Sequence, residues 1–338
     1  SELLSTFVHV YYFYKDMIKT VLLTGGNSML GLNTALALLR KGYRVRTLVR
    51  TSRPELRDCE IIYGNITSYQ DVYATSEGCD AIVHIAAATG QDLLRLADYT
   101  NINVVATENV CRASLATTAK RVIFVSTANT IGNGTNEHLA TENMPASKPF
   151  RDNLYAKSKI LAEQKALESG ANVLIINPTF MIGEYDSKPS SGKIITMNYG
   201  KKIIFAPKGG KNFVAASDVA QAIVNALPLT ITREKILTGG ENYSFKQFYQ
   251  RVASTQNHTV KIIEIPSCIL YFIGAIGSGL RFCGIKTPVS LTNMQILATQ
   301  EYYSSAKARE ELTMPQTPLN EAIRSCINWF KSAKMLPQ

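Results

Sequence analysis

The chain has 338 residues, of which 46% are hydrophobic and 18% are charged. This composition excludes a disordered or fibrous protein, and the length allows either one large domain or a nucleotide-binding domain with a smaller substrate domain. The formal net charge is +10, but the basic residues form no continuous run, which argues against nucleic-acid binding and fits attraction of a phosphorylated cofactor or an anionic substrate. We interpret the densest basic cluster as a solvated loop: Lys201, Lys202, Lys208 and Lys211.

The first sixteen residues contain an apolar, aromatic stretch from Leu3 to Tyr14, and Met17 follows it directly before a predicted strand. The stretch is too short for a membrane span and lacks the basic region and cleavage site of a signal peptide. We interpret residues 1–16 as an N-terminal extension, arising either from a misassigned start or as a packing arm.

From residue 20, short β-branched runs alternate with longer amphipathic segments, as in βαβ units. Helices are predicted over Met29–Lys41, Leu93–Thr117 and Asn153–Ser169, and Gly42 and Gly170 stand in the stop position of the first and last. The pattern indicates the α/β class, with a Rossmann-type doubly wound parallel sheet and a smaller, mostly C-terminal α/β substrate domain. The predicted strands are Thr20–Thr24, Arg44–Val49, Glu60–Tyr63, Ala81–Ile85, Arg121–Ser126, Asn172–Ile176 and Ile203–Phe205.

The alternation weakens after residue 178, where aromatics, glycines and prolines become frequent. We assign residues 17–178 and 203–238 to the nucleotide-binding domain, and residues 179–202 and 239–338 to a substrate-binding part. An apolar run from Ile265 to Gly284 is interrupted by a proline, four glycines and an arginine. This favours a helix or lid of the substrate part over a membrane anchor, so no integral membrane span is expected.

A glycine-rich segment, Thr24 to Gly31, lies directly after the first strand and opens the first helix. Gly25 permits a tight turn, Gly31 permits close helix–strand packing, and the helix N-terminus offers partial positive charge to a pyrophosphate. This context indicates a dinucleotide site.

Arg50 ends the second strand, where an acidic residue normally accepts the ribose hydroxyls of NAD. A guanidinium there can instead bind a 2′-phosphate, with Arg53 as a second donor. The sequence therefore favours NADP(H), with NAD(H) as the alternative.

Tyr155 and Lys159 stand four residues apart, on one face of a predicted helix. A tyrosine with a pKa of about 10 is a slow base at neutral pH, so we expect the Lys159 ammonium and the oxidised nicotinamide to lower its pKa. Tyr155 would then exchange a proton with a carbonyl or alcohol while hydride moves.

Together these motifs resemble the extended short-chain dehydrogenase/reductases of the NAD-dependent epimerase/dehydratase superfamily, near the dihydroflavonol-reductase-like and 3β-hydroxysteroid-dehydrogenase-like branches. The resemblance covers about residues 18 to 330. It rests on Thr24–Gly31, Asp80–Ala87, Asn103–Val110, Tyr155–Lys159, Asn177–Pro178 and Phe213–Ala220.

The resemblance implies the remaining site residues. The hydroxyl that holds the substrate oxygen falls on Thr127, with Ser126 as the fallback. Ser28 replaces the family's second glycine, so its hydroxyl either binds the phosphate or weakens cofactor binding, and Asn65 replaces an aspartate that meets the adenine. The implied cofactor contacts are Gly25, Asn27, Ser28, Met29, Leu30, Arg50, Asn65, Ile66, Ala86, Ala87, Asn103, Pro178 and Thr179.

Three functions fit this pattern. The favoured one is an NADP(H)-dependent reductase of a ketone or aldehyde, the second is a nucleotide-sugar epimerase or dehydratase with tightly bound NAD, and the third is a non-catalytic NAD(P)-binding regulatory protein. Aromatic and apolar segments in the substrate part slightly favour an apolar carbonyl compound over a sugar. The resemblance suggests a monomer or homodimer.

Six cysteines and four histidines show neither a CxxC pair nor the spacing of a metal site. We therefore expect no metal. Cysteines without a disulfide framework are typical of reduced thiols, so we expect a cytoplasmic protein.

Overall fold

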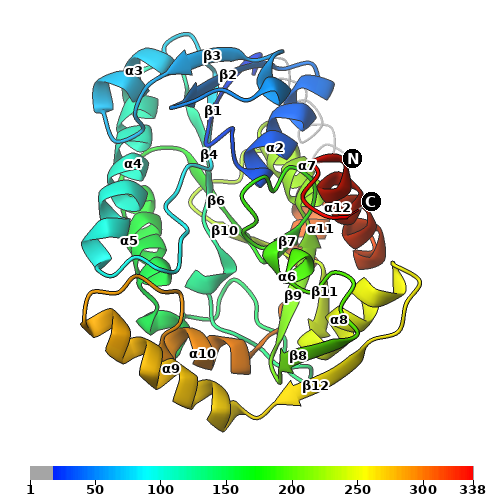
Figure 1. The fold of residues 1–338 in the computed structure, drawn as a ribbon. Helices are drawn as coiled ribbons and strands as arrows, with labels where there is room; N and C mark the ends of the chain where they lie inside the picture. The colour runs from blue at the N-terminus through cyan, green and yellow to red at the C-terminus, as the bar shows by residue number, and fades with distance from the viewer. Residues whose placement is uncertain (1–17, 338) are drawn as a thin grey trace.

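The computed structural model describes residues 18–337, so the proposed extension over residues 1–16 lies outside the described part of the chain. Seven parallel strands form the centre of the molecule in the order β10-β6-β5-β4-β1-β2-β3 (Figure 1). Their bounds are β1 Thr20–Thr24, β2 Arg44–Val49, β3 Glu60–Tyr63, β4 Ala81–His84, β5 Arg121–Val125, β6 Val173–Pro178 and β10 Lys235–Thr238. The Rossmann-type sheet expected from the sequence is confirmed.

Helices cover both faces of this sheet. On one face α3 (Tyr69–Ser76), α4 (Leu96–Ala116) and α5 (Leu154–Glu168) pack side by side, and on the other α2 (Met29–Arg40) packs on α7 (Ala216–Ala226), which also contacts α11 (Ala306–Leu312). Gly42 follows α2 with φ +90° and Gly170 follows α5 with φ +79°, a left-handed conformation that glycine adopts without steric cost. Both predicted stop signals are confirmed.

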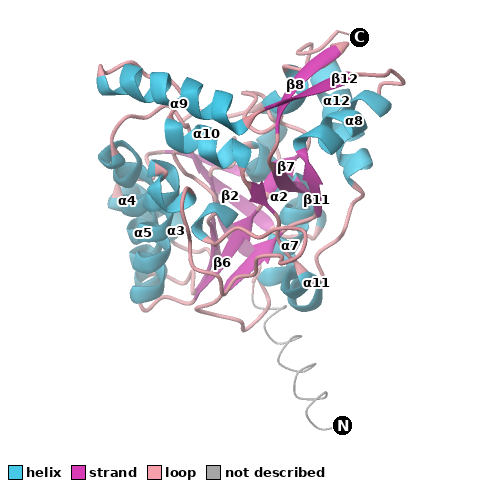
Figure 2. Cartoon of the chain, turned by 90° about the horizontal axis from the view of Figure 1, so that it is seen from below, coloured by secondary structure: helices cyan, strands magenta, loops and turns pink. Residues whose placement is uncertain are grey.

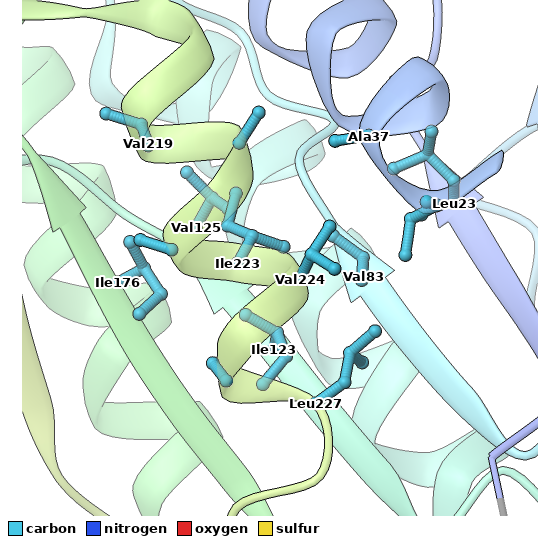
Figure 3. Close-up of a cluster of buried hydrophobic side chains, with 14 of the residues drawn as sticks. Leu23, Ala37, Val83, Ile123, Val125, Ile176, Val219, Ile223, Val224 and Leu227 are labelled. Atoms are coloured by element: carbon cyan, nitrogen blue, oxygen red, sulfur yellow. The ribbon is translucent and has the colours of Figure 1, made fainter. Parts of the chain in front are cut away.

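The continuous apolar runs of the strands serve two separate cores. In β1, Leu22 points to the α4 and α5 side, whereas Leu23 points to the α2 and α7 side. Figure 3 shows the second core, where Ile223 of α7 faces Val125 and Ile176 of the sheet. Each buried aliphatic side chain of this kind contributes about 1.5–3 kcal/mol, so burial on both faces fixes the sheet between its helices.

Two smaller sheets form the substrate part. One contains β7 (Phe180–Ile182), β9 (Gly210–Ala215), β11 (Glu241–Ser244) and β13 (Gln300–Glu301), and the other pairs β8 (Ile203–Pro207) with β12 (Lys261–Ile265). Their core is aromatic: the rings of Phe213 and Phe248 stack with centroids 4.3 Å apart. The helices of this part are α6 (Lys193–Thr196), α8 (Phe245–Ser254), α9 (Ser267–Phe282), α10 (Leu291–Ala298) and α12 (Leu319–Ser332).

Strands β8 and β9 fall within residues 203–238, which the sequence pattern assigns to the nucleotide-binding domain. They pair in the small sheets instead, while α7 and β10 of the same range join the large sheet. The chain therefore crosses between the two parts inside this range. The lysine cluster at 201–211 lies before this crossing, in and next to the strands of the small sheets.

The apolar run from Ile265 to Gly284 forms helix α9, as its interruptions predicted. Within residues 18–337 no helix is long and apolar enough to cross a membrane. α9 packs on α10 and on the segment before it through two glycines. A Cβ at Gly274 would lie 2.8 Å from the backbone of Leu291, and one at Gly277 would lie 2.5 Å from that of Val289.

The crossing of α2 over β1 gives a test of the fold. A Cβ at Gly31 would lie 2.1 Å from the carbonyl oxygen of Gly25, so we expect Gly31→Ala to destabilise the protein by about 1–3 kcal/mol or more. Gly279→Ala in α9 is the matched control, because no atom lies within 4 Å of its Cβ position, and it should stabilise the helix by up to about 1 kcal/mol. Urea unfolding of both variants measures the difference, and equal stability would contradict the close packing.

Candidate active site

A cleft of about 520 Å³ opens at the carboxyl edge of the large sheet, above the first turn of α2. The amides of Met29 and Leu30 lie in this turn and have no intrahelical acceptor, so they remain available to an anion. The sequence-derived cofactor residues that line the cleft are Gly25, Asn27, Ser28, Met29, Leu30, Arg50, Asn65, Ile66, Ala86, Ala87 and Pro178. The cleft also contains Ser126, Tyr155 and Lys159.

Ser28 caps helix α2. Its hydroxyl accepts a hydrogen bond from the Gly31 amide at 3.0 Å and donates to the Gly25 carbonyl at 2.8 Å. The side chain that replaces a family glycine is thus directed to the helix end, which stabilises the turn. Two buried oxygens in the cleft wall, Asn27 Oδ1 and Ser126 Oγ, have no hydrogen-bond partner. Free donors and acceptors around a cleft of this size fit a dinucleotide.

The two arginines after β2 have different surroundings. Arg50 is exposed and lines the cleft. Arg53 pairs with Glu55 at 2.6 Å and donates to Ser187 Oγ at 3.1 Å and to the backbone of Asn27 at 3.3 Å. Its guanidinium therefore holds the glycine-rich loop against the segment after β7, whereas Arg50 is available to a ligand.

Three other cofactor residues expected from the resemblance make contacts within the protein. Asn65 Oδ1 accepts from the Thr67 amide at 3.1 Å. Asn103 is buried, and its amide group binds the backbone of Ala88 and the hydroxyl of Ser158. Thr179 lines the neighbouring cavity and donates to Asn212 at 2.7 Å. Asn103 thus fixes the loop after β4, and Thr179 fixes β9.

Tyr155 and Lys159 project from α5 into the inner end of the cleft, near the end of β5. Asn153 caps α5 by accepting from the Ala156 amide at 2.9 Å. Lys159 Nζ donates to the Val125 carbonyl at 2.9 Å and lies 4.3 Å from the centre of the Phe124 ring. Thr127 hydrogen-bonds to the phenol of Tyr155. The structure therefore brings the three sequence-predicted catalytic residues together.

Burial governs the protonation of this pair. It raises the pKa of Tyr155 to about 12, and the hydrogen bond with Thr127 offsets only part of the rise. Burial also lowers the pKa of Lys159 to about 7, although Glu163 opposes that shift. The expected lowering of the Tyr155 pKa by Lys159 is not seen in the chain alone, where desolvation is the largest effect and Glu163 and Tyr99 add to the rise.

A buried polar network lies behind the pair and was missed from the sequence. Glu163 accepts from Thr130 at 2.6 Å and from Asn177 at 2.7 Å, and it pairs with Lys235 at 2.5 Å. Asn177 also donates to the Thr127 carbonyl at 3.0 Å. Glu163 follows Tyr155 at the helical spacing i, i+8, a signal that was present in the sequence. The network holds Thr127 in place beside Tyr155.

A second cavity of about 450 Å³ adjoins the cleft and shares Pro178 with it. Thr127 opens into this cavity, so its inner end lies at the catalytic residues. Its apolar wall comes mainly from the segment around α10 and from β7, with the residues Phe180, Pro288, Val289, Met294, Ile296 and Leu297.

Lys211 and Glu301 form a buried ion pair in the wall of this second cavity. They are the two charged side chains among the described residues that line it. Burial raises the pKa of Glu301, and Lys211 opposes the rise. The sequence does not reveal this pair because 90 residues separate its members, and the basic cluster around Lys211 instead favours a solvated loop.

Comparison with known proteins places the chain in a family. Residues 21–235 match the model of the NAD dependent epimerase/dehydratase family. The chain belongs to this family. It is therefore a nicotinamide-dependent oxidoreductase of the extended short-chain dehydrogenase/reductase type.

Relatives span nearly the whole chain. A protein of Synechocystis sp. with the provisional name dihydroflavonol 4-reductase is 27% identical over 91% of this chain and 94% of its own length. A 3-beta-hydroxysteroid dehydrogenase of Mycolicibacterium neoaurum is 23% identical over 92% of this chain and 91% of its own. The crystal structure of gox2253 matches the fold with a TM-score of 0.81, at 24% identity over 94% of this chain and all of that one.

The geometry supports proton transfer at a carbonyl oxygen. A bound nicotinamide would supply or accept hydride at the junction of the cleft and the cavity. Tyr155 keeps its proton at neutral pH and can donate it to an oxygen next to Thr127. The mostly apolar wall of the cavity lowers the local dielectric constant, which strengthens these hydrogen bonds.

The shifted pKa of Lys159 predicts how stability depends on pH. The unfolded lysine binds its proton up to a pKa of about 10.5, whereas the folded one releases it near 7, so the burial penalty is complete below pH 7 and disappears as pH rises toward 10.5. Lys159→Met should therefore gain stability over wild type at pH 6 and lose this advantage by pH 9–10. Urea unfolding across this range tests the sign, and a constant difference would contradict the shift.

The Lys211–Glu301 pair allows a double-mutant test. Lys211→Met leaves a buried carboxylate without its partner, which should cost about 3–5 kcal/mol at pH 8 and less at pH 5, where Glu301 can take up a proton. The double variant with Glu301→Gln should recover most of this loss. Thermal unfolding of the two single variants and the double variant measures the coupling, and additive losses would show that the pair is independent.

Proposed function

We propose that the chain is an NADP(H)-dependent reductase of an apolar ketone or aldehyde, which also oxidises the corresponding alcohol. The observation that carries this proposal is the cavity that meets the Tyr155 phenol at Thr127. Its exposed wall is mostly apolar, although five amide side chains also line it: Gln91, Asn129, Asn153, Asn212 and Asn293. A neutral carbonyl compound can enter this cavity without leaving a charge unpaired.

A nucleotide sugar fits the same cavity poorly. Its diphosphate needs cationic side chains, preferably arginines with bidentate geometry. Lys211 is the cation in this wall, and Glu301 already neutralises it. The cavity therefore favours a reductase over an epimerase.

The cofactor preference depends on Arg50. An exposed guanidinium at the cleft can pair with a 2′-phosphate, which NADP(H) carries and NAD(H) lacks. Arg53 contributes indirectly by holding the loop beside it. A cytoplasmic location remains a prediction that the six free cysteines support, and a monomer or homodimer remains the expectation for assembly.

Proton transfer is assigned to Tyr155. In the reducing direction the phenol donates its proton to the carbonyl oxygen while Thr127 orients that oxygen. The raised pKa suits a donor, since the phenol stays protonated throughout the neutral range. Lys159 lies one helical turn after Tyr155. Its pKa of about 7 lets the charge of its ammonium group respond to the cofactor.

Cofactor titration tests the role of Arg50. NADPH should bind the stripped protein at least tenfold more tightly than NADH, and Arg50→Ala should reduce NADPH affinity toward the NADH value because a charge-assisted contact is lost. Protein fluorescence quenching measures both affinities.

Arg57→Ala is the matched control, since Arg57 is an exposed arginine outside the cleft and should leave the preference unchanged. Tighter NADH binding by wild type would favour the epimerase alternative. Binding of neither nucleotide would favour a non-catalytic protein.

A screen of apolar ketones with NADPH tests the reaction. For any ketone that wild type reduces, Tyr155→Phe should lower kcat by about 10²–10⁴-fold, because the proton donor is removed. NADPH affinity should stay within about twofold, since the ring remains. Wild-type rates in the variant would contradict the assignment of Tyr155.

A further inference from the structure

Helix α9 exposes large apolar side chains over most of its surface. Phe272 is 68% exposed and Phe282 is 94% exposed, and Ile276 is 53% exposed. The buried residues of this helix, Leu270, Gly274 and Gly277, form the narrow side that packs on α10. Exposed apolar surface of this extent on one helix indicates an interaction site.

A second apolar strip lies at the same end of the molecule. The pair β8 and β12 exposes Ile203, Phe205 and Ile263, and the register places Phe205 directly beside Ile263. Figures 1 and 2 both place α9 and this strand pair at one end of the molecule, with α10 between α9 and the large sheet. We call the two strips together the α9 surface.

The charges around the α9 surface are mostly positive. Exposed lysines flank it at the two ends of the strand pair and beyond α9: Lys201, Lys202, Lys208, Lys261 and Lys286. Between residues 261 and 298 the sequence has one acidic residue, Glu264. Arg281 does not add to this charge at the surface, because its guanidinium binds the backbone carbonyls of Gln91, Leu93 and Thr287.

We propose that the α9 surface docks on the face of an anionic lipid bilayer. Ile276, Phe272 and Phe282 enter the boundary between headgroups and acyl chains, and the lysines bind the anionic headgroups. α9 lies on the membrane without spanning it. Charge favours lipid over a second copy of the chain, since two such lysine-flanked surfaces repel each other and both are attracted to anionic lipid.

Docking also gives the substrate a route into the cavity from the membrane. This part of the inference rests on the proposed function. α10 lines the second cavity with Met294 and Leu297, and Met294 also lies against Gly274 of α9. Helix α10, with α9 packed on its outer side, therefore separates the cavity from the lipid. An apolar carbonyl compound dissolved in the membrane can reach the catalytic residues by displacing α10 from α9.

Vesicle flotation of the full chain tests the docking. The vesicles contain either phosphatidylcholine alone or equal parts of phosphatidylcholine and phosphatidylglycerol. Wild type should float with the anionic vesicles at low salt, and the partition coefficient should fall at high salt as the lysines are screened. Phe272→Glu/Ile276→Glu should lower the partition coefficient at least tenfold.

Leu115→Glu/Leu161→Glu is the matched control, since it places two carboxylates at exposed leucines of α4 and α5, outside the α9 surface, and should float like wild type. NADPH binding and thermal unfolding show that each variant is folded. Failure of wild type to float, or equal losses in both variants, overturns the proposal. So does a wild-type dimer that Phe272→Glu/Ile276→Glu makes monomeric, because the surface would then join two copies. Wild type that reduces a ketone with NADPH but does not float contradicts the docking and leaves the proposed function standing.

Discussion

Desolvation of a partly buried phenol and a fully buried ammonium at the end of one sheet is the constraint on which this structure depends. Water would leave Tyr155 and Lys159 close to their ordinary pKa values. At this site the phenol resists losing its proton and the ammonium holds its proton less tightly, so Tyr155 stays neutral and Lys159 is about half charged at pH 7. A neutral donor beside an apolar cavity suits reduction of a carbonyl oxygen.

The rest of the fold maintains this burial. The network of Glu163, Asn177 and Thr130 fills the space behind Thr127 with buried, hydrogen-bonded side chains. On the cavity side, Asn153 binds both Gln91 and Asn293 at 3.0 Å, so α5, the loop after β4 and α10 meet at one amide group. Asn153, which caps the catalytic helix α5, thus also holds α10 in place along the wall of the cavity.

The large sheet and its helices could be predicted because their signals are local. Apolar runs, the stop glycines Gly42 and Gly170, and the turn at Gly25 act within a few residues. The cofactor cleft followed from these elements, since parallel strands end at one edge. Ser28 shows the limit of such inference, because only the structure reveals that its hydroxyl is used to cap α2.

The substrate part could not be predicted to the same depth, because its contacts are long-range. Lys211 meets Glu301 from another strand, and Lys235 meets Glu163 from the far side of β6. The pKa of Tyr155 also depends on burial that no local spacing reveals. These features decide which substrate fits and which protonation state persists.

Transfer of deuterium from NADPH labelled at C4 to an apolar ketone tests the central claim most directly. In single turnovers followed by mass spectrometry, the account predicts one deuterium in the alcohol product of wild type, and loss of this product with Tyr155→Phe although NADPH still binds. Label that stays in the nucleotide with every ketone, or a product that forms equally fast without the phenol, would contradict the account.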